Sequence, residues 1–394
     1  MRLLLGLDAL TPPLTGIGYY TLNLLRELQA RQDISVQGIS YRGWWTAEQV
    51  AQYLQHEASP PSDSSTHGQE PWWHGLRIAA RDLPAAYHAA KWWRDRKCGR
   101  MLSKCPQDAL YHEPNFVSYP FPGRTVITVH DLSHIRHPEA HPPSRVAHLN
   151  RCLPRSVKQA EGIIVDSNYI KGELLELGLE ADPSRVHVTH LGYEPGFHPR
   201  DEATTLNARQ RFGLGWRGFV LSVATLEPRK NLERLLQAYL VLPASLAKHY
   251  PLVLAGGGGW KGTPLKDLIA GVTPPHRVVV TGYLHRHEVQ ELMASAAVFA
   301  YPSLYEGFGL PVLEAMASAT PVLTSDSTSL GEVAGQAALT VPPREVEAIE
   351  QGLISLLESE ASRDRLRHLG LLRAGMFSWQ RCAEETLEVY RHLN

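Results

Sequence analysis

The sequence predicts an α/β protein built from two doubly wound, Rossmann-like domains. The chain has 394 residues, which is too long for one ordinary domain. Short apolar runs alternate with helical stretches in both halves, as parallel strands alternate with helices in such folds. Glycine-rich or polar turns follow several apolar runs, and the carboxyl ends of strands are where these sheets bind ligands.

Composition limits the function classes. Apolar residues make up 43% of the chain and charged residues 20%, which is typical of globular domains with full-sized cores. The net charge of −1 gives no overall bias toward nucleic acid, and no segment reaches the eighteen or so apolar residues of a membrane span. The spacings of the four cysteines fit no zinc or redox motif and indicate reduced thiols in a cytosolic protein.

The N-terminal half begins as a doubly wound domain does. A first strand ends near Asp8, a loop over Thr11–Tyr20 follows, and Thr21–Ala30 is helical. The loop contains Gly16 and Gly18, but glycine pairs in loops are usually turns. The third glycine of a dinucleotide fingerprint is missing.

Two further strands of this half end in polar residues. Asp108–His112 and Thr125–Asp131 each read as buried strands, so His130 and Asp131 lie at a carboxyl edge where sites are built. The strand Gly162–Ser167 leads into a helix that Ser167 is placed to cap. After a last strand over Val186–Tyr193, a segment rich in glycine and proline is typical of a linker.

A histidine-rich segment follows His130. His134, His137 and His141 raise the question of a metal site, but Pro138 interrupts any helix and no acid or cysteine spacing completes a ligand set. We expect loop or acceptor-facing histidines and no metal.

Residues 72–104 combine tryptophan with many cations. The stretch carries four tryptophans and eight lysines or arginines against Asp82 and Asp95. A basic helix with tryptophan can lie on an anionic membrane surface, and it can equally be an ordinary helix with solvated cations. Both interpretations stay open, while nucleic acid is disfavoured because no recognised binding motif is nearby.

The C-terminal half opens with a strand over Phe219–Ala224 and a turn over Thr225–Asn231. Arg229 and Lys230 come at a helix start, where the helix dipole already favours anions. They can form a diphosphate clamp, although a pair of surface cations is the plainer explanation for this turn alone. A later strand over Val278–Leu284 contains Tyr283 near its end.

The most informative stretch is Tyr301–Met316, with the sequence Tyr-Pro-Ser-Leu-Tyr-Glu-Gly-Phe-Gly-Leu-Pro-Val-Leu-Glu-Ala-Met. It predicts the end of a strand, a loop over Ser303–Leu310, and a helix opened by Pro311. Glu306 lies in the loop and Glu314, eight positions later, in the expected first helical turn. Either acid alone fits a structural role better than a catalytic one.

The whole string resembles the nucleotide-sugar site of retaining GT-B glycosyltransferases of the GT4 family. Four other segments resemble that family: the first glycine loop, Thr128–Ser133, Leu226–Leu232 and the last helix. The resemblance runs nearly end to end and is weakest over residues 40–105. One departure is Ala224-Thr225, where many members carry an additional arginine.

The resemblance implies a GT-B architecture. Residues 1–192 would form an acceptor-binding domain, residues 193–375 a nucleotide-sugar-binding domain facing it across a central cleft, and residues 376–394 a helix crossing back to the first domain. It implies catalytic roles for Glu306, His130, Lys230 and Arg229. It implies donor-binding roles for Glu314, Gly307, Phe308, Gly309, Leu310, Gly16, Gly18 and Tyr283, while Asp131 would brace its loop.

The resemblance also implies the reaction. It is similar to that of bacterial mannosyl- and rhamnosyltransferases of O-antigen and polysaccharide synthesis, with GDP-mannose as the first candidate donor and GDP-rhamnose the second. A UDP- or dTDP-sugar is a further alternative. The acceptor would be a lipid-linked saccharide, no metal or cofactor would be needed, and the protein would be cytoplasmic or peripheral on the inner membrane. A non-catalytic GT-B scaffold is the alternative of another class.

Overall fold

The computed structural model describes residues 1–11, 14–58, 84–257 and 264–393, with side chains described except at 47, 54–58 and 84–92. The chain divides into two compact units. Unit 1 comprises Met1–Val165, Glu173–Thr189 and Ala383–Asn394, and unit 2 comprises Asp166–Gly172 and His190–Cys382. Residues 166–172, which we expected in the first domain, thus cluster with unit 2.

Unit 1 contains a seven-stranded sheet of order β3-β2-β1-β4-β5-β6-β7. All neighbours pair in parallel except β2 and β3. Its strands are β1 (Arg2–Gly6), β2 (Ser35–Ser40), β3 (Gly43–Trp45), β4 (Leu110–Glu113), β5 (Arg124–Val129), β6 (Gly162–Val165) and β7 (Val186–Val188).

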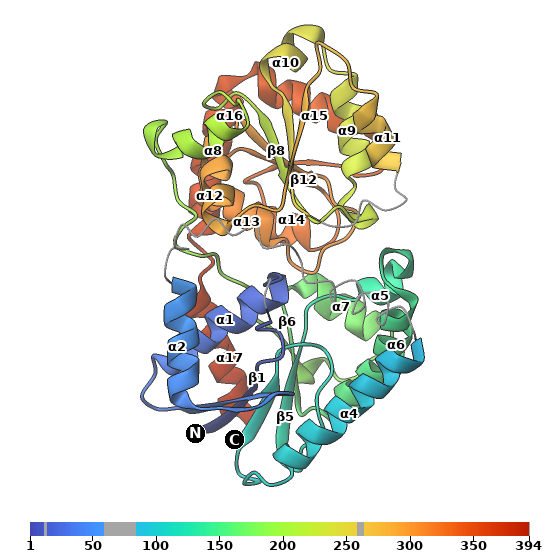
Figure 1. Ribbon diagram of the computed structural model, residues 1–394, viewed down its shortest axis with the longest axis vertical. Coiled ribbons are helices and arrows are strands. Elements are labelled where there is room, and N and C mark those ends of the chain that lie inside the picture. Colours follow the sequence, from blue (N-terminus) through green and yellow to red (C-terminus); the bar gives the residue numbers. More distant parts are fainter. Residues whose placement is uncertain (12–13, 59–83, 258–263, 394) are drawn as a thin grey trace, which may run out of the picture. The chain divides into compact units, whose positions relative to one another are not determined.

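Helices cover both faces of this sheet (Figure 1). Successive residues of β1 point to opposite faces, so Leu4 packs in a cluster with Cys98 and Leu102 while Leu5 packs in a cluster with Leu25. The helical segments assigned to or reaching into unit 1 are α1 (Gly16–Gln29), α2 (Ala47–Ala58), α4 (Pro84–Leu102), α5 (Ser133–Arg136), η1 (Pro138–Ala140), α6 (Pro143–Gln159), α7 (Asn168–Glu176), η2 (Pro183–Arg185) and α17 (Trp379–Leu393).

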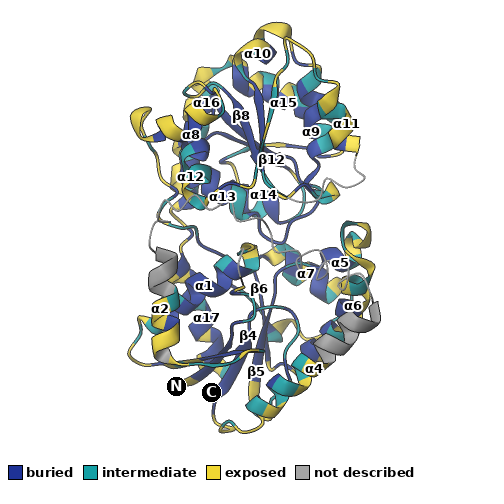
Figure 2. Cartoon of the chain, in the orientation of Figure 1, coloured by how far each residue is buried: buried dark blue, intermediate teal, exposed yellow. Residues whose placement is uncertain are grey.

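Unit 2 contains a six-stranded, fully parallel sheet of order β10-β9-β8-β11-β12-β13. Its four central strands are buried, as expected for a parallel sheet covered on both faces (Figure 2), whereas the edge strands β10 and β13 are only partly buried. The strands are β8 (Val220–Val223), β9 (Leu252–Ala255), β10 (Val278–Gly282), β11 (Val298–Tyr301), β12 (Val322–Ser325) and β13 (Leu339–Val341).

The helices of unit 2 sandwich this sheet, with α9 and α11 on one side and α8 and α12 on the other (Figure 1). The helical segments are η3 (Ala203–Thr205), α8 (Leu206–Arg211), η4 (Pro228–Lys230), α9 (Leu232–Leu240), α10 (Ala244–His249), α11 (Pro264–Ala270), α12 (Arg286–Ser295), α13 (Leu310–Ala317), α14 (Ser329–Ala334), α15 (Val346–Glu358) and α16 (Glu360–Ala374). Two sheets of mainly parallel strands with helices on their faces confirm the predicted α/β class.

Two local predictions were wrong. Gly16 and Gly18 do not lie in a loop, because α1 already begins at Gly16. A Cβ on Gly18 would come within 3.0 Å of the Ala9 carbonyl and the Leu14 side chain, so this glycine serves close packing of the helix start. Glu314 lies in the second turn of α13, because the helix begins at Leu310 after Gly309 adopts a positive φ of 105°.

Candidate active site

The sheet order of unit 2 determines where a ligand site can form. Strands β8 and β11 are neighbours, but β9 follows β8 on one side and β12 follows β11 on the other. The chain therefore turns away from this point in both directions, which opens a crevice beyond the carboxyl ends of the two strands. The turn after β8 carries Lys230, and the loop after β11 carries Glu306.

Lys230 and Glu306 form a buried ion pair at this point. The Lys230 Nζ lies 2.7 Å from Glu306 Oε1 and 2.9 Å from the hydroxyl of Tyr301, the last residue of β11. The same Oε1 accepts from Tyr301 at 2.9 Å and from Ser303 at 2.7 Å. Burial alone would raise the pKa of Glu306, but the charges of Lys230 and Arg229 outweigh it and bring this pKa to about 2.

The ammonium of Lys230 has one more N–H donor than the hydrogen bonds it makes with the described residues. An ammonium carries three N–H donors, and the part of the chain that the structure describes engages two of them, with Tyr301 and Glu306. Burial lowers the pKa of Lys230, and the neighbouring Glu306 raises it. The pair can therefore offer a desolvated positive group to an anion.

Arg229 closes the other side of the Glu306 carboxylate. Its Nη1 donates to Glu306 Oε2 at 3.2 Å and to the Tyr305 carbonyl at 3.0 Å. Its Nε donates to Glu227 at 3.1 Å. The predicted clamp residues thus come together, with Glu306 and Glu227 as their counter-ions.

The turn and the loop are also joined through their backbones. Asn231, with a positive φ of 61°, donates from its side chain to the carbonyls of Pro302 and Pro343 at 2.9 and 2.6 Å. The Arg229 carbonyl accepts from the Leu304 N–H at 2.8 Å and from the Ser303 hydroxyl at 2.9 Å. These bonds fix the spacing between the cations and Glu306.

The residues after Glu306 have distinct surroundings. Ser329 donates to the carbonyls of Glu306 and Phe308 at 2.8 and 3.1 Å, and Ser167 donates to the Gly307 carbonyl at 2.8 Å. The ring of Phe308 is buried against His190 and Phe377, so only its backbone is placed to meet a ligand.

Gly309 makes the close turn into α13. A Cβ at this position would contact Leu330, and the backbone there is left-handed, so a side chain would be strained. Leu310 then starts the helix. The loop therefore passes from Glu306 into the amino end of α13 without room for substitution at Gly309.

Glu314 and Tyr283 are the remaining predicted donor-binding residues of unit 2. Glu314 is buried and accepts from Arg286 at 2.5 Å. Tyr283 follows β10 and is 65% exposed, and the position of a Cβ on Gly257 would lie 3.5 Å from its Cβ. Tyr283 follows β10 and Glu314 follows β11, two strands of the same sheet that β9 and β8 separate.

His130, Gly16 and Gly18 belong to unit 1. His130 follows β5, and its Nε2 donates to the Pro114 carbonyl at 2.9 Å while its ring packs edge-on against Tyr20. Tyr20 in turn hydrogen-bonds Thr128 at 3.1 Å. Asp131 accepts from the backbone and hydroxyl of Ser133 and so braces the loop after β5.

The histidines after His130 have separate partners. His141 hydrogen-bonds Ser133 at 2.7 Å, and His137 lies 3.1 Å from Glu139. His134 is buried beside Phe116, and this burial lowers its pKa to about 4. Among the described residues, no group of three or more His, Cys, Asp or Glu side chains is arranged to hold a metal ion.

A second group of carboxylates lies at the corresponding point of unit 1, between β1 and β4. Asp8 accepts from the hydroxyl of Tyr119, from Arg94 at 3.2 Å and from the Tyr41 N–H at 2.8 Å. Glu113, the last residue of β4, accepts from Tyr111 at 2.7 Å. We call this group the Asp8 network.

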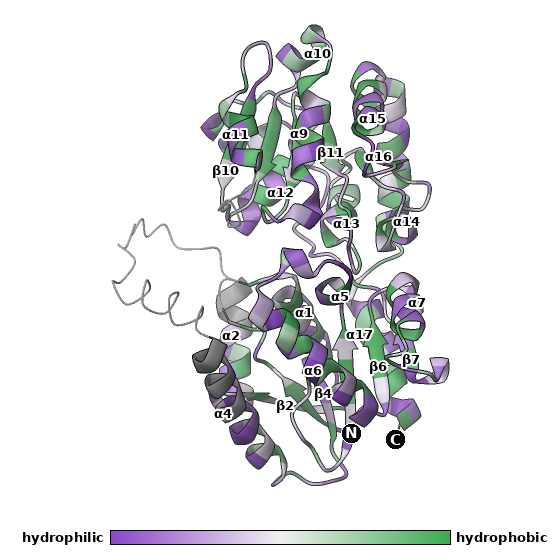
Figure 3. Ribbon diagram, turned by 90° about the vertical axis from the view of Figure 1, so that its right-hand side faces the viewer, coloured by the Kyte–Doolittle hydropathy of each residue, from purple (hydrophilic) through white to green (hydrophobic). Residues whose placement is uncertain are grey.

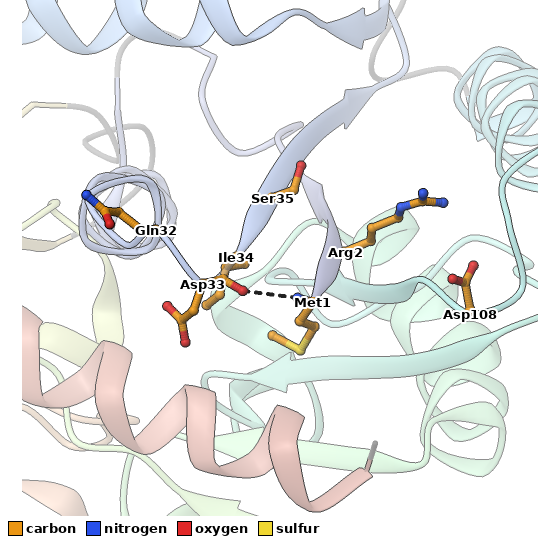
Figure 4. Close-up of a pocket in the computed structure, with 7 residues that line it drawn as sticks. All are labelled: Met1, Arg2, Gln32, Asp33, Ile34, Ser35 and Asp108. Carbon is orange, nitrogen blue, oxygen red and sulfur yellow. Dashed lines mark hydrogen bonds between the residues drawn. The ribbon is translucent and has the colours of Figure 1, made fainter.

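One hollow of about 490 Å³ lies elsewhere in unit 1 (Figure 4). It is at the amino ends of β1 and β2, where the Met1 nitrogen donates to the Asp33 carbonyl at 3.0 Å. This is the edge of the sheet away from the strand ends that bind ligands in such folds, so we assign it no chemistry.

The basic tryptophan-bearing stretch is described only in part. Residues 72–83 and the side chains of 84–92 lie outside the described residues. In the remaining turns of α4, which are largely hydrophilic in Figure 3, Trp93 is 58% exposed and Lys97 lies 5.4 Å from its ring centroid. No helix that the structure describes is long and apolar enough to cross a bilayer.

Sequence reasoning missed several contributors to the site. Tyr301 and Ser303 stand inside the motif and carry a signal, since a polar residue that ends a buried strand often serves a site. The sequence gives no comparable signal for Arg286, Glu194 and Ser329, because each is a common residue type whose partner is far away in the sequence.

Comparison with known proteins gives consistent results. Residues 207–370 match the family described as glycosyl transferases group 1. The chain is 34% identical over 393 residues to O-antigen chain mannosyltransferase B of Escherichia coli, covering 100% of both chains. It is 30% identical over 282 residues to the serotype-specific mannosyltransferase WbdA of Escherichia coli, covering 69% of this chain and 34% of WbdA.

A solved structure supports the fold. WaaG, a glycosyltransferase involved in lipopolysaccharide biosynthesis, superposes with a TM-score of 0.68 at 18% identity, covering 98% of each chain. At this identity the likeness shows the fold alone, which is GT-B.

Proposed function

Because the chain belongs to the group 1 glycosyl transferases, we propose that this enzyme transfers mannose from GDP-mannose to a lipid-linked saccharide in O-antigen or related polysaccharide synthesis. The observation that carries the proposal is the buried Lys230–Glu306 pair with one ammonium donor in reserve. The full-length similarity to an O-antigen chain mannosyltransferase supports the choice of sugar and pathway.

The cations act on the leaving group. Lys230 donates its remaining N–H to the diphosphate of the donor, and Arg229 adds a second positive charge from the same turn. As the bond between the mannose C1 and the phosphate oxygen breaks, negative charge grows on the diphosphate. Fixed, desolvated cations stabilise that charge more than mobile water does.

The two glutamates hold the sugar and the nucleoside. Oε1 of Glu306 already accepts from three side chains, so the sugar hydroxyls contact Oε2, which accepts only from Arg229 among the described residues. Glu314 accepts from the ribose hydroxyls. The backbone of residues 307–310 and the end of β10 at Tyr283 complete the donor site, and His130 meets the donor sugar.

Transfer proceeds with retention of configuration. The acceptor hydroxyl attacks C1 from the face that the diphosphate leaves, and its proton passes to the departing phosphate oxygen. The new C1–O bond therefore forms where the old one breaks, and GDP is released. Glu306 engages Lys230, Tyr301 and Ser303, so we assign it no covalent intermediate.

The test is calorimetric titration of the purified protein without added metal, with and without a chelator. The donors are GDP-mannose, GDP-rhamnose, UDP-glucose, UDP-N-acetylglucosamine and dTDP-rhamnose. Tight, chelator-insensitive binding of GDP-mannose, followed by mannose transfer to a polyprenyl-diphosphate saccharide, is the expected result. Preference for another nucleotide sugar would overturn the donor assignment, and silence across the panel would favour a non-catalytic scaffold.

The described end of α4 supports a peripheral contact with an anionic membrane on the cytoplasmic side. Its surface carries the exposed Trp93 with Arg96, Lys97, Arg100 and Lys104. Tryptophan suits the membrane interface, and the cations suit acidic lipid headgroups. Sedimentation with vesicles containing phosphatidylglycerol should deplete the protein, and Lys97→Glu with Arg100→Glu should abolish the depletion. Equal sedimentation of wild type and variant would contradict the contact.

A further inference from the structure

Arg286 connects the donor-site glutamate to the segment that follows β7. It is the first residue of α12, which lies beside α13 (Figure 1). Its Nη2 donates to Glu314 Oε1 at 2.5 Å and its Nε to Glu194 Oε2 at 3.1 Å. The guanidinium thus divides its side-on edge between two carboxylates instead of pairing bidentately with one.

A third contact fixes the plane of the guanidinium. The Arg286 Cζ lies 4.5 Å from the ring centroid of Phe197, which is itself buried. Glu194 and Phe197 belong to one segment, and Arg200 of that segment donates to the Gly196 carbonyl at 3.1 Å. Two edge contacts and one face contact leave the guanidinium little freedom to turn.

The position of Glu314 depends on this arginine. The Glu314 carboxylate is buried, and among the described residues it accepts from Arg286 alone. A buried carboxylate without a partner is costly, and it would turn or take up a proton. With Oε1 fixed by Arg286, Oε2 remains to accept from a ligand.

We propose that Arg286 is a positioning residue for donor binding, holding Glu314 as an oriented carboxylate for the ribose hydroxyls and tying that orientation to Glu194. This inference rests on the proposed function, because it assumes that Glu314 binds the nucleoside of the donor. It assigns Arg286 a role that acts through Glu314.

The main test is a double-mutant cycle measured by GDP titration. Arg286→Gln should weaken GDP binding about tenfold, the scale of losing one charge-assisted hydrogen bond. Glu314→Gln should weaken it similarly, and adding Arg286→Gln to Glu314→Gln should change little more. Additive effects of the two substitutions would overturn the proposal, because Arg286 would then act independently of Glu314.

A pH series separates positioning from general packing. Burial raises the pKa of Glu314, Arg286 lowers it, and Glu194 raises it. Without Arg286 the pKa of Glu314 rises further. As the pH falls, Arg286→Gln should therefore begin to lose GDP affinity at a higher pH than wild type does. A merely structural arginine would weaken binding equally at all pH values.

Two control variants complete the experiment. Arg211→Gln breaks the ion pair between Arg211 of α8 and Glu288, which lies on α12 as Arg286 does. This variant should leave GDP affinity unchanged. Arg286→Lys keeps the charge and should recover part of the affinity, and it gives a measurable protein if Arg286→Gln fails to fold. If wild type binds no nucleotide, the proposed function fails. If wild type binds GDP and both Arg286→Gln and Arg286→Lys bind it as tightly as wild type does, only this inference fails.

Discussion

The two sheets place ionisable side chains at corresponding points but partner them differently. Beyond β8 and β11 of unit 2, Lys230 pairs with Glu306 and keeps one donor for a ligand. Beyond β1 and β4 of unit 1, Asp8 and Glu113 accept from tyrosine hydroxyls, and Arg94 completes the group. The same topology thus holds an ion pair with a further ammonium donor in one unit, where we propose an anion site, and a network of hydrogen-bonded carboxylates in the other. What each crevice can bind therefore depends on which hydrogen-bond donors remain available there, and not on the strand order alone.

The largest expected effect comes from removing the cation of unit 2. Lys230→Ala should lower sugar transfer about a thousandfold, because a desolvated donor to the leaving diphosphate is lost. Transfer rates with a thermal melt to verify folding provide the measurement. Lys248→Ala, at an exposed position of α10, is the matched control and should be silent. If folded Lys230→Ala lost less than tenfold in transfer rate, the Lys230–Glu306 pair would no longer differ in function from the Asp8 network.

The next effect sharpens the role of Glu306. Glu306→Gln should lower transfer about a hundredfold at neutral pH, comparable to losing one fixed electrostatic contact. Burial lowers the pKa of Lys230 and Glu306 raises it, so the substitution lowers it further. In the proposed mechanism transfer needs the ammonium of Lys230, so the alkaline loss of activity should begin at lower pH in the variant. An unchanged alkaline limb of the pH–rate profile would show that Glu306 does not act through Lys230.

Acid should destabilise unit 1 before unit 2. Burial lowers the pKa of His112 from 6.5 to about 3, so below pH 6.5 the unfolded state takes up the proton first and stability falls. At pH 5 this costs about 2 kcal/mol. Glu306, with its pKa lowered from 4.5 to about 2, keeps its contribution above pH 4.5 and loses it as the pH falls toward 2.

Hydrogen exchange resolved by segment measures this difference. Between pH 7 and pH 5, after correction for intrinsic rates, β4 and β5 should lose protection while β8 and β11 keep it. His112→Gln removes the titrating group and should flatten the response of unit 1. Equal loss of protection in both sheets would contradict the comparison.

The smallest effect should come from the Asp8 network. Asp8→Asn keeps the shape of the side chain but weakens its bonds to Tyr119 and Arg94, at a cost of about 1.5 kcal/mol. The melting temperature should fall while GDP affinity stays unchanged. A loss of GDP affinity without a loss of stability would mean that this network serves the ligand after all.

The fold class and the centre of the site followed from local patterns. A strand, a glycine loop and a helix start within Tyr301–Met316 made Glu306 a candidate, and the turn after β8 did the same for Lys230. Their meeting follows from sheet order, because parallel strands that neighbour each other end at one edge. That part of the site was predictable because the turn with Lys230 and the loop with Glu306 can each be recognised from neighbouring residues in the sequence.

Other features depended on contacts between distant residues. Nothing near Arg286 in the sequence indicates that it divides its donors between Glu194 and Glu314, since side-chain packing decides this. Local propensity disfavours glycine in helices, and Gly16 and Gly18 therefore favour a loop when only the sequence is considered. Packing of Gly18 against Ala9 outweighs that preference.

The path of the chain through the units bears on the order of events during synthesis. Unit 1 includes residues 383–393, which follow all of unit 2 in the sequence. The Tyr390 hydroxyl lies 2.5 Å from the ring of His112, and the Leu393 side chain lies beside Gly162. A ribosome therefore completes every residue of unit 2 before it delivers residues 383–393, the part of α17 that belongs to unit 1. The half whose synthesis begins first is the last to gain its full set of contacts.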